Sequence, residues 1–197
     1  MKDNTCLPYA FNTKQADCQS LVHLINLFLG DNIIGAEVGV FRGTSLCTFL
    51  QQCPSISKLY GIDNFKPYAD CLKIPYDGTP AYTVDIKQSE YNKLTAYHNI
   101  KYSGYQDKVI FLEKDSRDAL QDIEDNSLDF IFLDTYMTID QAREDVNTWY
   151  SKVKTGGLFA GHDANSLEVQ TAVLELRSKL SIKNKVSVFD NTWVWIK

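Results

Sequence analysis

The stretch Glu37-Val38-Gly39-Val40-Phe41-Arg42-Gly43-Thr44-Ser45 decides the fold, because it joins a strand to a helix through a glycine-containing turn. The apolar run at residues 34–38 predicts the strand, and residues 45–53 predict the helix, which Pro54 ends. A strand followed directly by a helix is the repeating unit of open sheets that carry helices on both faces. We therefore expect an α/β chain organised around this turn.

The same alternation continues along the chain. Runs rich in Ile, Leu, Phe and Val predict parallel strands that are covered on both faces, at residues 58–62, 109–112 and 128–133 and beginning at 158–160. Helical spacing predicts helices at residues 14–29, 85–102, 139–153 and 165–180. Thr138 and Gln141 have capping-box spacing at the start of the third of these helices, and Gly156 and Gly157 are expected to stop it. Asn165 and Glu168 have the equivalent spacing before the fourth helix.

The C-terminal end of the chain departs from this pattern. The strand-like runs 186–189 and 193–196 are separated by only three residues, which cannot hold a crossover helix, so the two strands must be antiparallel. The prediction is one α/β domain over residues 1–197, with a doubly wound, seven-stranded, mostly parallel sheet that ends in an antiparallel hairpin. Residues 1–32 are expected to form a helical cap. The Pro- and Tyr-containing segment 64–107 is expected to be a lid or acceptor-site insertion, with surface decoration as the alternative.

Composition narrows the class of protein. A chain of 197 residues with 44% hydrophobic residues suits a single globular domain, and its net charge of −5 disfavours a nucleic-acid partner, although a local basic patch stays open. The longest N-terminal apolar run is too short to span a bilayer, and it lacks the features of a signal peptide. Five cysteines without a Cys-x-x-Cys pair indicate reduced thiols in a cytoplasmic protein.

Acidic side chains recur where the predicted strands end, which is where open α/β sheets bind their ligands. Glu37 lies in the first strand, and Asp63, Asp115, Asp134 and the pair His162-Asp163 follow later strands. Converging carboxylates favour a cationic ligand such as S-adenosylmethionine, which carries a sulfonium and an ammonium group. A dinucleotide needs a Gly-x-Gly-x-x-Gly turn for its pyrophosphate, and that turn is absent. A nucleotide-dependent oxidoreductase on a similar sheet remains the alternative.

Several of these motifs carry a family resemblance. The stretch Glu37 to Ser45 resembles the cofactor motif of class I S-adenosylmethionine-dependent methyltransferases, and it is most similar to the catechol and caffeoyl-CoA O-methyltransferase group. Residues 60–63, 128–134 and 156–163 are similar to a small-molecule family known as methyltransferase domain 24, whose fifth strand ends in Gly-His-Asp. The closing hairpin with Trp193 and Trp195 also looks like the end of that family. The resemblance implies O-methylation of a small molecule. From the net charge and the short apolar run we expect no nucleic-acid or membrane partner, and a homodimer stays open.

The resemblance also implies a role for each residue of the motifs. Those that would line the methionine end of the cofactor are Glu37, Gly39, Phe41, Gly43, Thr44 and Ser45. Asp63 would accept hydrogen bonds from the ribose hydroxyls, Asp115 and Ser116 would contact the adenine, and Asp134 would lie near the sulfonium. As alternatives, Ser116 could be only a helix N-cap, and Asp63 and Asp134 could be turn or cap residues.

The resemblance is less complete for the acceptor chemistry. Asp134 and Asp163 occupy two positions that hold a divalent cation in the catechol group, so Mg²⁺ or another divalent cation is a candidate, but Ala164 replaces an Asn ligand. The alternative is that Asp163 caps the following helix or bonds the loop. Residues 135–137 lack the Lys or His that related enzymes have there, which makes His162 the candidate general base. Two alternatives stay open: His162 could have only a structural role, and the protein could bind the cofactor without catalysing a reaction.

Overall fold

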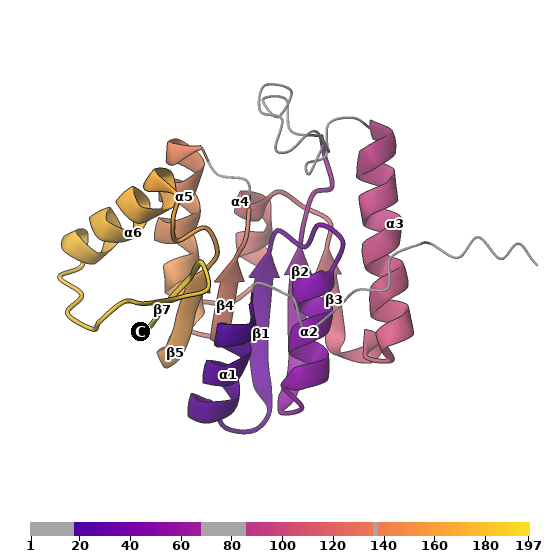
Figure 1. Cartoon of the computed structure of the whole chain (residues 1–197), viewed down its shortest axis with the longest axis horizontal. Helices are drawn as coiled ribbons and strands as arrows, with labels where there is room; N and C mark the ends of the chain where they lie inside the picture. Colours follow the sequence, from indigo (N-terminus) through magenta and orange to yellow (C-terminus); the bar gives the residue numbers. More distant parts are fainter. Residues whose placement is uncertain (1–17, 68–85, 136–137) are drawn as a thin grey trace, which may run out of the picture.

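A seven-stranded sheet with the order β3-β2-β1-β4-β5-β7-β6 forms the centre of the protein in a computed structural model, which describes residues 18–67, 86–135 and 138–197 (Figure 1). Its strands are β1 (Ile33–Val38), β2 (Ile56–Ile62), β3 (Val109–Leu112), β4 (Leu128–Leu133), β5 (Val153–Gly161), β6 (Ser187–Phe189) and β7 (Thr192–Ile196). Strands β1 to β5 pair in parallel, and β7 is antiparallel to both β5 and β6. This confirms the predicted doubly wound sheet with a terminal hairpin.

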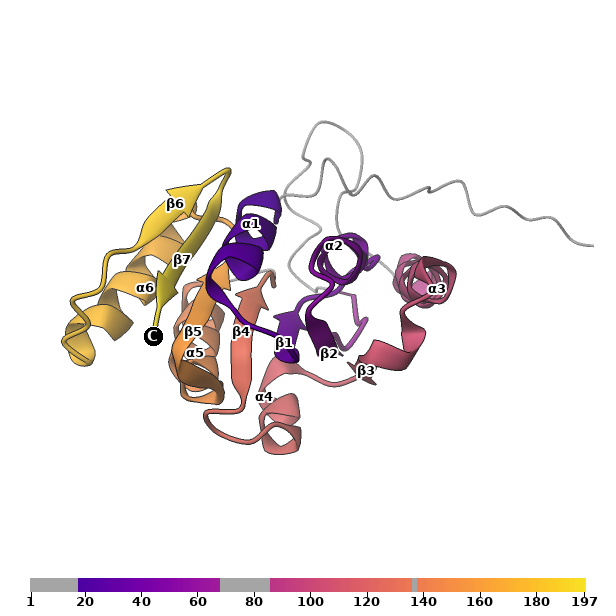
Figure 2. The same cartoon turned by 90° about the horizontal axis from the view of Figure 1, so that it is seen from below.

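Helices cover both faces of the sheet. They are α1 (Gln19–Phe28), α2 (Thr44–Gln52), α3 (Ile86–Ser103), α4 (Ser116–Ala119), α5 (Ile139–Trp149) and α6 (Leu167–Lys179), with short 3-10 turns at Gln106–Lys108, Leu120–Asp122 and Tyr150–Lys152. Helices α1, α2 and α3 lie over one face, and α4, α5 and α6 lie over the other (Figure 2).

The central strand β4 shows why the sheet needs two covering layers. Phe130 and Phe132 pack against the core under α1 and α2, whereas Ile131 and Leu133 pack against the core under α5 and α6. All four side chains are buried, as expected for alternating residues of a strand that is covered on both faces. The sheet is therefore anchored from both sides, which holds the ends of its strands in place.

The end of α5 differs from the prediction of a helix over 139–153. Helix α5 ends at Trp149, and β5 already begins at Val153, so Gly156 and Gly157 lie inside a strand and do not stop the helix. The reason is a bulge in β5. Between the pairs Leu128↔Val153 and Phe130↔Leu158, β4 has one intervening residue and β5 has four, so the extra residues of β5 bulge out of the pairing. Gly156 adopts φ +86°, a left-handed conformation that glycine takes without strain.

The caps of α5 and α6 test two further predictions. Thr138 caps α5 as expected, because its side chain accepts a hydrogen bond from the backbone N of Gln141 at 3.3 Å. The cap of α6 was expected at Asn165, but Ser166 takes that place and accepts from the backbone N of Val169 at 3.4 Å. The backbone N of Asn165 instead donates to Asn191 Oδ1 at 2.9 Å, which keeps Asn165 outside the helix. Asp163 is likewise not the cap.

Other predictions lie partly outside the described residues. Cys18, Cys47 and Cys53 are free and buried, whereas Cys6 and Cys71 fall outside the described ranges. Most of the predicted cap 1–32 and the part of the predicted lid at 68–85 fall outside as well. In the part of the chain that is described, every helix is too short or too polar to cross a membrane.

Candidate functional site

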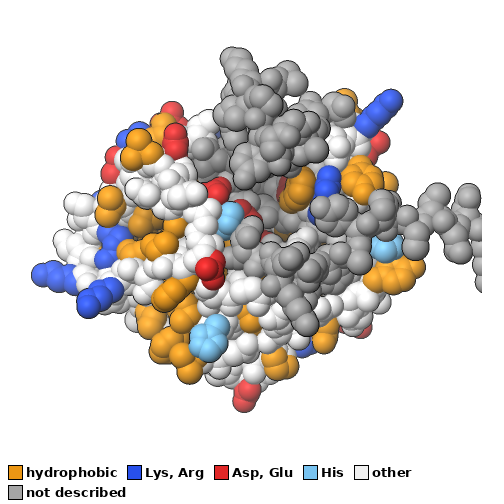
Figure 3. Space-filling model, in the orientation of Figure 1, with side chains coloured by type: hydrophobic (Ala, Val, Ile, Leu, Met, Phe, Trp, Pro, Cys, Tyr) orange, Lys and Arg blue, Asp and Glu red, His pale blue; other side chains and the backbone are white. Residues whose placement is uncertain are grey.

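A cavity of about 500 Å³ lies at the carboxyl ends of the parallel strands. Gly39 after β1, Asp63 after β2, Asp115 and Ser116 after β3, and Thr135 after β4 contribute to its lining. On the face drawn in Figure 3, acidic side chains and a histidine gather near the centre, at the end of the sheet toward which the parallel strands point. Residues that are far apart in the sequence thus meet at one edge, because parallel strands end together.

The turn after β1 is packed tightly against the end of β4. Gly39 has φ +94°, and its backbone N donates to the Ile62 oxygen at 2.8 Å. A Cβ atom at Gly39 would lie 2.0 Å from the Asp134 backbone oxygen, which is far inside contact distance. Both the left-handed conformation and the close approach therefore require glycine at this position.

Glu37 is a fully buried carboxylate beside this turn, with 0% exposure. Its Oε1 accepts a hydrogen bond from the Ser45 hydroxyl, whereas no group in the described part of the chain donates to its Oε2. Burial raises the pKa of Glu37 well above its usual value, repulsion from Asp134 and Asp63 adds to the rise, and the Ser45 hydrogen bond opposes it. Buried polar atoms in proteins nearly always have a partner, so Oε2 indicates a missing donor or cation.

Asp63 organises the backbone around the cavity. Its Oδ2 accepts from the backbone N of Phe41 at 2.8 Å, and its Oδ1 accepts from the backbone N of Phe65 at 2.7 Å. Phe41 and Phe65 have φ values of 52° and 48°, an unfavourable region for residues with a Cβ atom, so these bonds hold two strained turns in place. Each carboxylate oxygen keeps a further lone pair with which it could accept from a ligand.

Asp115 forms the wall of the cavity beyond β3. It accepts from Asn64 Nδ2 at 2.5 Å and from Lys66 Nζ at 3.2 Å. The Asn64 hydrogen bond, together with Lys66 and against the effect of burial, holds the pKa of Asp115 below its usual value. The Asp115 side chain does not cap α4. Sequence reasoning did not identify Asn64 or Lys66, which lie one and three residues after Asp63, in the segment assigned to the lid.

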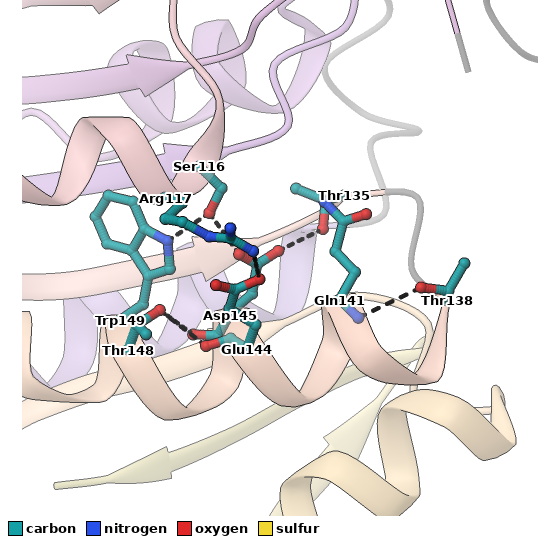
Figure 4. A network of polar contacts seen from close by, with 9 residues as sticks. All are labelled: Ser116, Arg117, Thr135, Thr138, Gln141, Glu144, Asp145, Thr148 and Trp149. Atoms are coloured by element: carbon teal, nitrogen blue, oxygen red, sulfur yellow. Dashed lines mark hydrogen bonds and ion pairs between the residues drawn. The ribbon is translucent and has the colours of Figure 1, made fainter. Parts of the chain in front are cut away.

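A second buried carboxylate, Asp145, lies behind Ser116 and was also missed (Figure 4). Asp145 is 3% exposed on α5 and lines the cavity. Its Oδ1 accepts from the Ser116 hydroxyl at 2.5 Å, and its Oδ2 accepts from the Thr135 hydroxyl at 3.1 Å. Burial raises the pKa of Asp145, and these two hydrogen bonds oppose the rise. An acidic residue between Ala142 and Trp149, on the apolar face of the helix, was the available sequence signal.

Asp134, His162 and Asp163 form a cluster whose possible ligand atoms lie within 4.8 Å of one another. His162 Nδ1 is 3.4 Å from Asp134 Oδ1 and 3.2 Å from Asp163 Oδ1. Burial lowers the pKa of His162, but the hydrogen bonds and charges of the two carboxylates outweigh it and raise this pKa to about 10. In this arrangement the imidazole is protonated at neutral pH, which is not the form in which a general base accepts a proton.

The C-terminal hairpin holds the loop that carries this cluster. The Ala164 backbone N donates to the Asn191 oxygen at 2.9 Å, and Trp193 Nε1 donates to the His162 oxygen at 2.9 Å. Asn191 Nδ2 also reaches Asp163 Oδ1 at 3.4 Å. Because Asp163 has φ 54°, its conformation needs such support from outside the loop.

The predicted site residues therefore fall into two neighbouring groups. Gly39, Asp63, Asp115 and Ser116 line the cavity, whereas Glu37 and the Asp134 cluster lie at the same end of the sheet without being part of that lining. Of the remaining predicted residues, Phe41 is 39% exposed, Gly43 has φ +76° and precedes α2, and Thr44 and Ser45 begin that helix. Which part of a cofactor each of them contacts stays a prediction.

Comparisons with known proteins agree with this geometry. Residues 36–164 match a protein family described as a methyltransferase domain. No curated protein sequence matches the chain. Its fold is similar to the O-methyltransferase NovP (18% identity, TM-score 0.65, covering 94% of this chain and 79% of that one). It is also similar to a candidate caffeoyl-CoA O-methyltransferase from Staphylococcus aureus (16%, 0.60, 91% and 81%) and to an S-adenosylmethionine-dependent O-methyltransferase from Thermotoga maritima (16%, 0.59, 88% and 53%).

Proposed function

The chain belongs to the methyltransferase family whose domain matches residues 36–164, and from this premise we propose that it transfers a methyl group from S-adenosylmethionine to an oxygen atom of a small-molecule acceptor. The observation that carries the proposal is the buried Oε2 of Glu37, which has no donor in the described part of the chain. A ligand ammonium group would supply both the missing hydrogen bond and the missing positive charge.

The hydrogen-bond acceptors at this end of the sheet fit such a ligand. Glu37 would accept from the ammonium group at the turn that Gly39 keeps narrow, and Asp63 would accept from the ribose hydroxyls at the end of β2. Asp115 and Ser116 lie further along the cavity wall, where the adenine is expected. Carboxylates at these positions attract a cationic ligand and would repel a pyrophosphate, so they disfavour the oxidoreductase alternative.

When bound, S-adenosylmethionine supplies an electrophilic methyl group on a sulfonium. The task of the protein is mainly to hold donor and acceptor close and in line. Asp63, which lines the cavity, contributes by fixing the turns at Phe41 and Phe65. His162 stays the predicted base for the acceptor's proton, and to act as one it would first have to release the proton that Asp134 and Asp163 hold on it.

The same cluster supports a divalent cation as part of the proposal. Two carboxylates and an imidazole are a suitable donor set, and Asp134, His162 and Asp163 would hold the ion. Such an ion would lower the pKa of an acceptor hydroxyl. We expect the cation-free protein to bind Mn²⁺ in a calorimetric or paramagnetic-resonance titration, and Asp163→Ala to abolish binding. Equal Mn²⁺ binding by the wild type and the variant would exclude this site.

Calorimetric titration with S-adenosylmethionine and S-adenosylhomocysteine tests the function directly. We expect binding by the wild type and loss of binding in Asp63→Ala, with Asp107→Ala on the exposed 3-10 turn before β3 as the matched control. A wild-type protein that binds neither ligand at millimolar concentration would refute the proposal. Binding of NADH would favour the oxidoreductase alternative.

Turnover separates an enzyme from a protein that only binds the cofactor. With a panel of catechol, phenol and sugar hydroxyl acceptors, an O-methyltransferase forms S-adenosylhomocysteine in step with a methylated product. Cofactor binding without product formation from any acceptor would support the non-catalytic alternative.

A further inference from the structure

The network around Asp145 links the end of β3 to the end of β4 across the cavity wall (Figure 4). Ser116 follows β3 and Thr135 follows β4, and each hydroxyl bonds a different oxygen of the Asp145 carboxylate, at 2.5 and 3.1 Å. All three residues line the cavity, and Asp145 is 3% exposed. A buried carboxylate with two hydroxyl partners is a fixed arrangement, because each partner satisfies one oxygen.

The direction of each hydrogen bond in this network is determined. Trp149 Nε1 lies 2.7 Å from Ser116 Oγ, and an indole nitrogen can only donate, so Ser116 accepts this bond. The single hydroxyl hydrogen of Ser116 is then given to Asp145 Oδ1, since an ionised carboxylate can only accept. Thr135 must donate its hydrogen to Oδ2 for the same reason. Neither hydroxyl has a hydrogen left for a ligand.

The cavity wall formed by Ser116, Thr135 and Asp145 therefore offers hydrogen-bond acceptors to a ligand. Two cations also line the cavity, but they bond carboxylates outside this wall: Arg117 pairs with Glu144 and Lys114 with Asp122. A ligand group that carries N–H donors matches this wall. A carbonyl oxygen in the same place would face other acceptors and would leave its own hydrogen bond unmade, which is costly.

We propose that Asp145 is a specificity-determining residue, which orients the Ser116 and Thr135 hydroxyls so that the cavity selects the exocyclic amine of adenine over a carbonyl oxygen. The inference rests on the proposed function, since it assigns this wall to the adenine end of the cofactor. Asp145 acts through the two hydroxyls and is a positioning residue in this sense.

The test compares S-adenosylhomocysteine with S-inosylhomocysteine, which carries a carbonyl group in place of the exocyclic amine. One mismatched hydrogen bond in a buried site corresponds to about a tenfold or larger change in affinity. We expect the wild type at pH 8 to bind the adenosine compound at least about tenfold more tightly. In Asp145→Asn the new amide group must donate a hydrogen bond to one of the two hydroxyls. That hydroxyl then turns its own hydrogen toward the ligand, and we expect the ratio of the affinities for the adenosine and inosine compounds to fall by about tenfold.

Two further variants keep this test independent of folding. Asp107→Asn removes a carboxylate at an exposed position outside the cavity lining, and we expect it to leave the affinity ratio unchanged. Thr135→Val keeps the side-chain shape but removes one acceptor, so the ratio should fall here too, even if Asp145→Asn does not fold. A general loss of packing would weaken both ligands equally and leave the ratio as it is.

The outcomes separate the inference from the function on which it rests. A wild type that binds neither compound refutes the methyltransferase function itself. A wild type that binds both compounds equally overturns the inference about Asp145 and leaves the function standing. The inference is also overturned if the Asp145→Asn protein folds, binds and keeps the wild-type ratio.

Discussion

Replacing Glu37 with glutamine is expected to stabilise the ligand-free protein above pH 4.5 while it weakens cofactor binding. In the wild type the carboxylate is fully buried, and its Oε2 has no donor among the described residues. Burial therefore holds the pKa of Glu37 well above its usual value of 4.5. The glutamine variant keeps the shape and the possible bond to Ser45 but never carries the buried charge.

The pH range of this effect follows from proton linkage. Below pH 4.5 both the folded and the unfolded wild type hold the proton on Glu37, and the two proteins should have similar stability. Above that pH the unfolded chain releases the proton while the folded protein retains it. The wild type then loses up to about 1.4 kcal/mol of unfolding free energy per pH unit, until the folded pKa is passed. The variant lacks this loss, so its advantage grows with pH and then levels off.

Thermal unfolding at several pH values measures the effect. For a chain of this size 1 kcal/mol corresponds to about 2–4 °C in Tm, so the two melting curves should separate by roughly 3–6 °C per pH unit above pH 4.5. Glu124→Gln, at an exposed position, is the matched control and should follow the wild type. In the same samples, loss of a charge-assisted bond should weaken S-adenosylmethionine binding by about 10- to 100-fold. Wild-type and Glu37→Gln melting temperatures that run parallel from pH 4.5 to 8 would refute the reasoning.

Three further predictions concern individual packing and capping contacts. Gly39→Ala should abolish cofactor binding and strongly destabilise the protein, because the added Cβ atom would collide with the backbone of Asp134. Gly156 also has a positive φ but has open space around it. Gly156→Ala should therefore lower the free energy of unfolding, measured by chemical denaturation, by only about 1–2 kcal/mol. Trp149→Phe keeps an aromatic ring but removes the indole donor, and urea unfolding should show a loss of about 1–3 kcal/mol; no change would mean that this bond contributes nothing. Ser166→Ala should cost about 1 kcal/mol and Asn165→Ala much less, and the reverse order would restore the predicted cap at Asn165.

The parallel strands could be predicted closely because their signal is local. The predicted strands 109–112 and 128–133 coincide with β3 and β4, since each is dominated by Ile, Leu, Val and Phe. Strand β4 is covered on both faces as expected, whereas β3 lies at the edge of the sheet and has no fully buried residue. The start of β5 could not be found in this way. Its first residues form a bulge with Gly156 and Gly157, and glycines after a helix also indicate a helix end, so local sequence could not separate the two.

The site shows the same division between local and distant signals. Asp63 and Asp115 were predictable, because each directly follows a strand of a sheet whose ligand edge is known from topology. Asp145 was not, because its importance depends on hydroxyls that lie 10 and 29 residues away in sequence and meet it only in the fold. The raised pKa of His162 likewise depends on where the side chains of Asp134 and Asp163 point, which the sequence does not specify.

Substitutions or deletions in the antiparallel hairpin at the edge of the sheet should have effects beyond the hairpin itself. Asn191 lies in the turn between β6 and β7 and Trp193 lies on β7, yet both bond the backbone of the loop that carries His162. A lesion in this hairpin would therefore disturb the loop that carries His162 as well as the core, in which Trp193 and Trp195 are buried. Minimal versions trimmed to the parallel strands would lose the support of that loop, so any shortened variant that is meant to keep the cluster of Asp134, His162 and Asp163 has to include the hairpin.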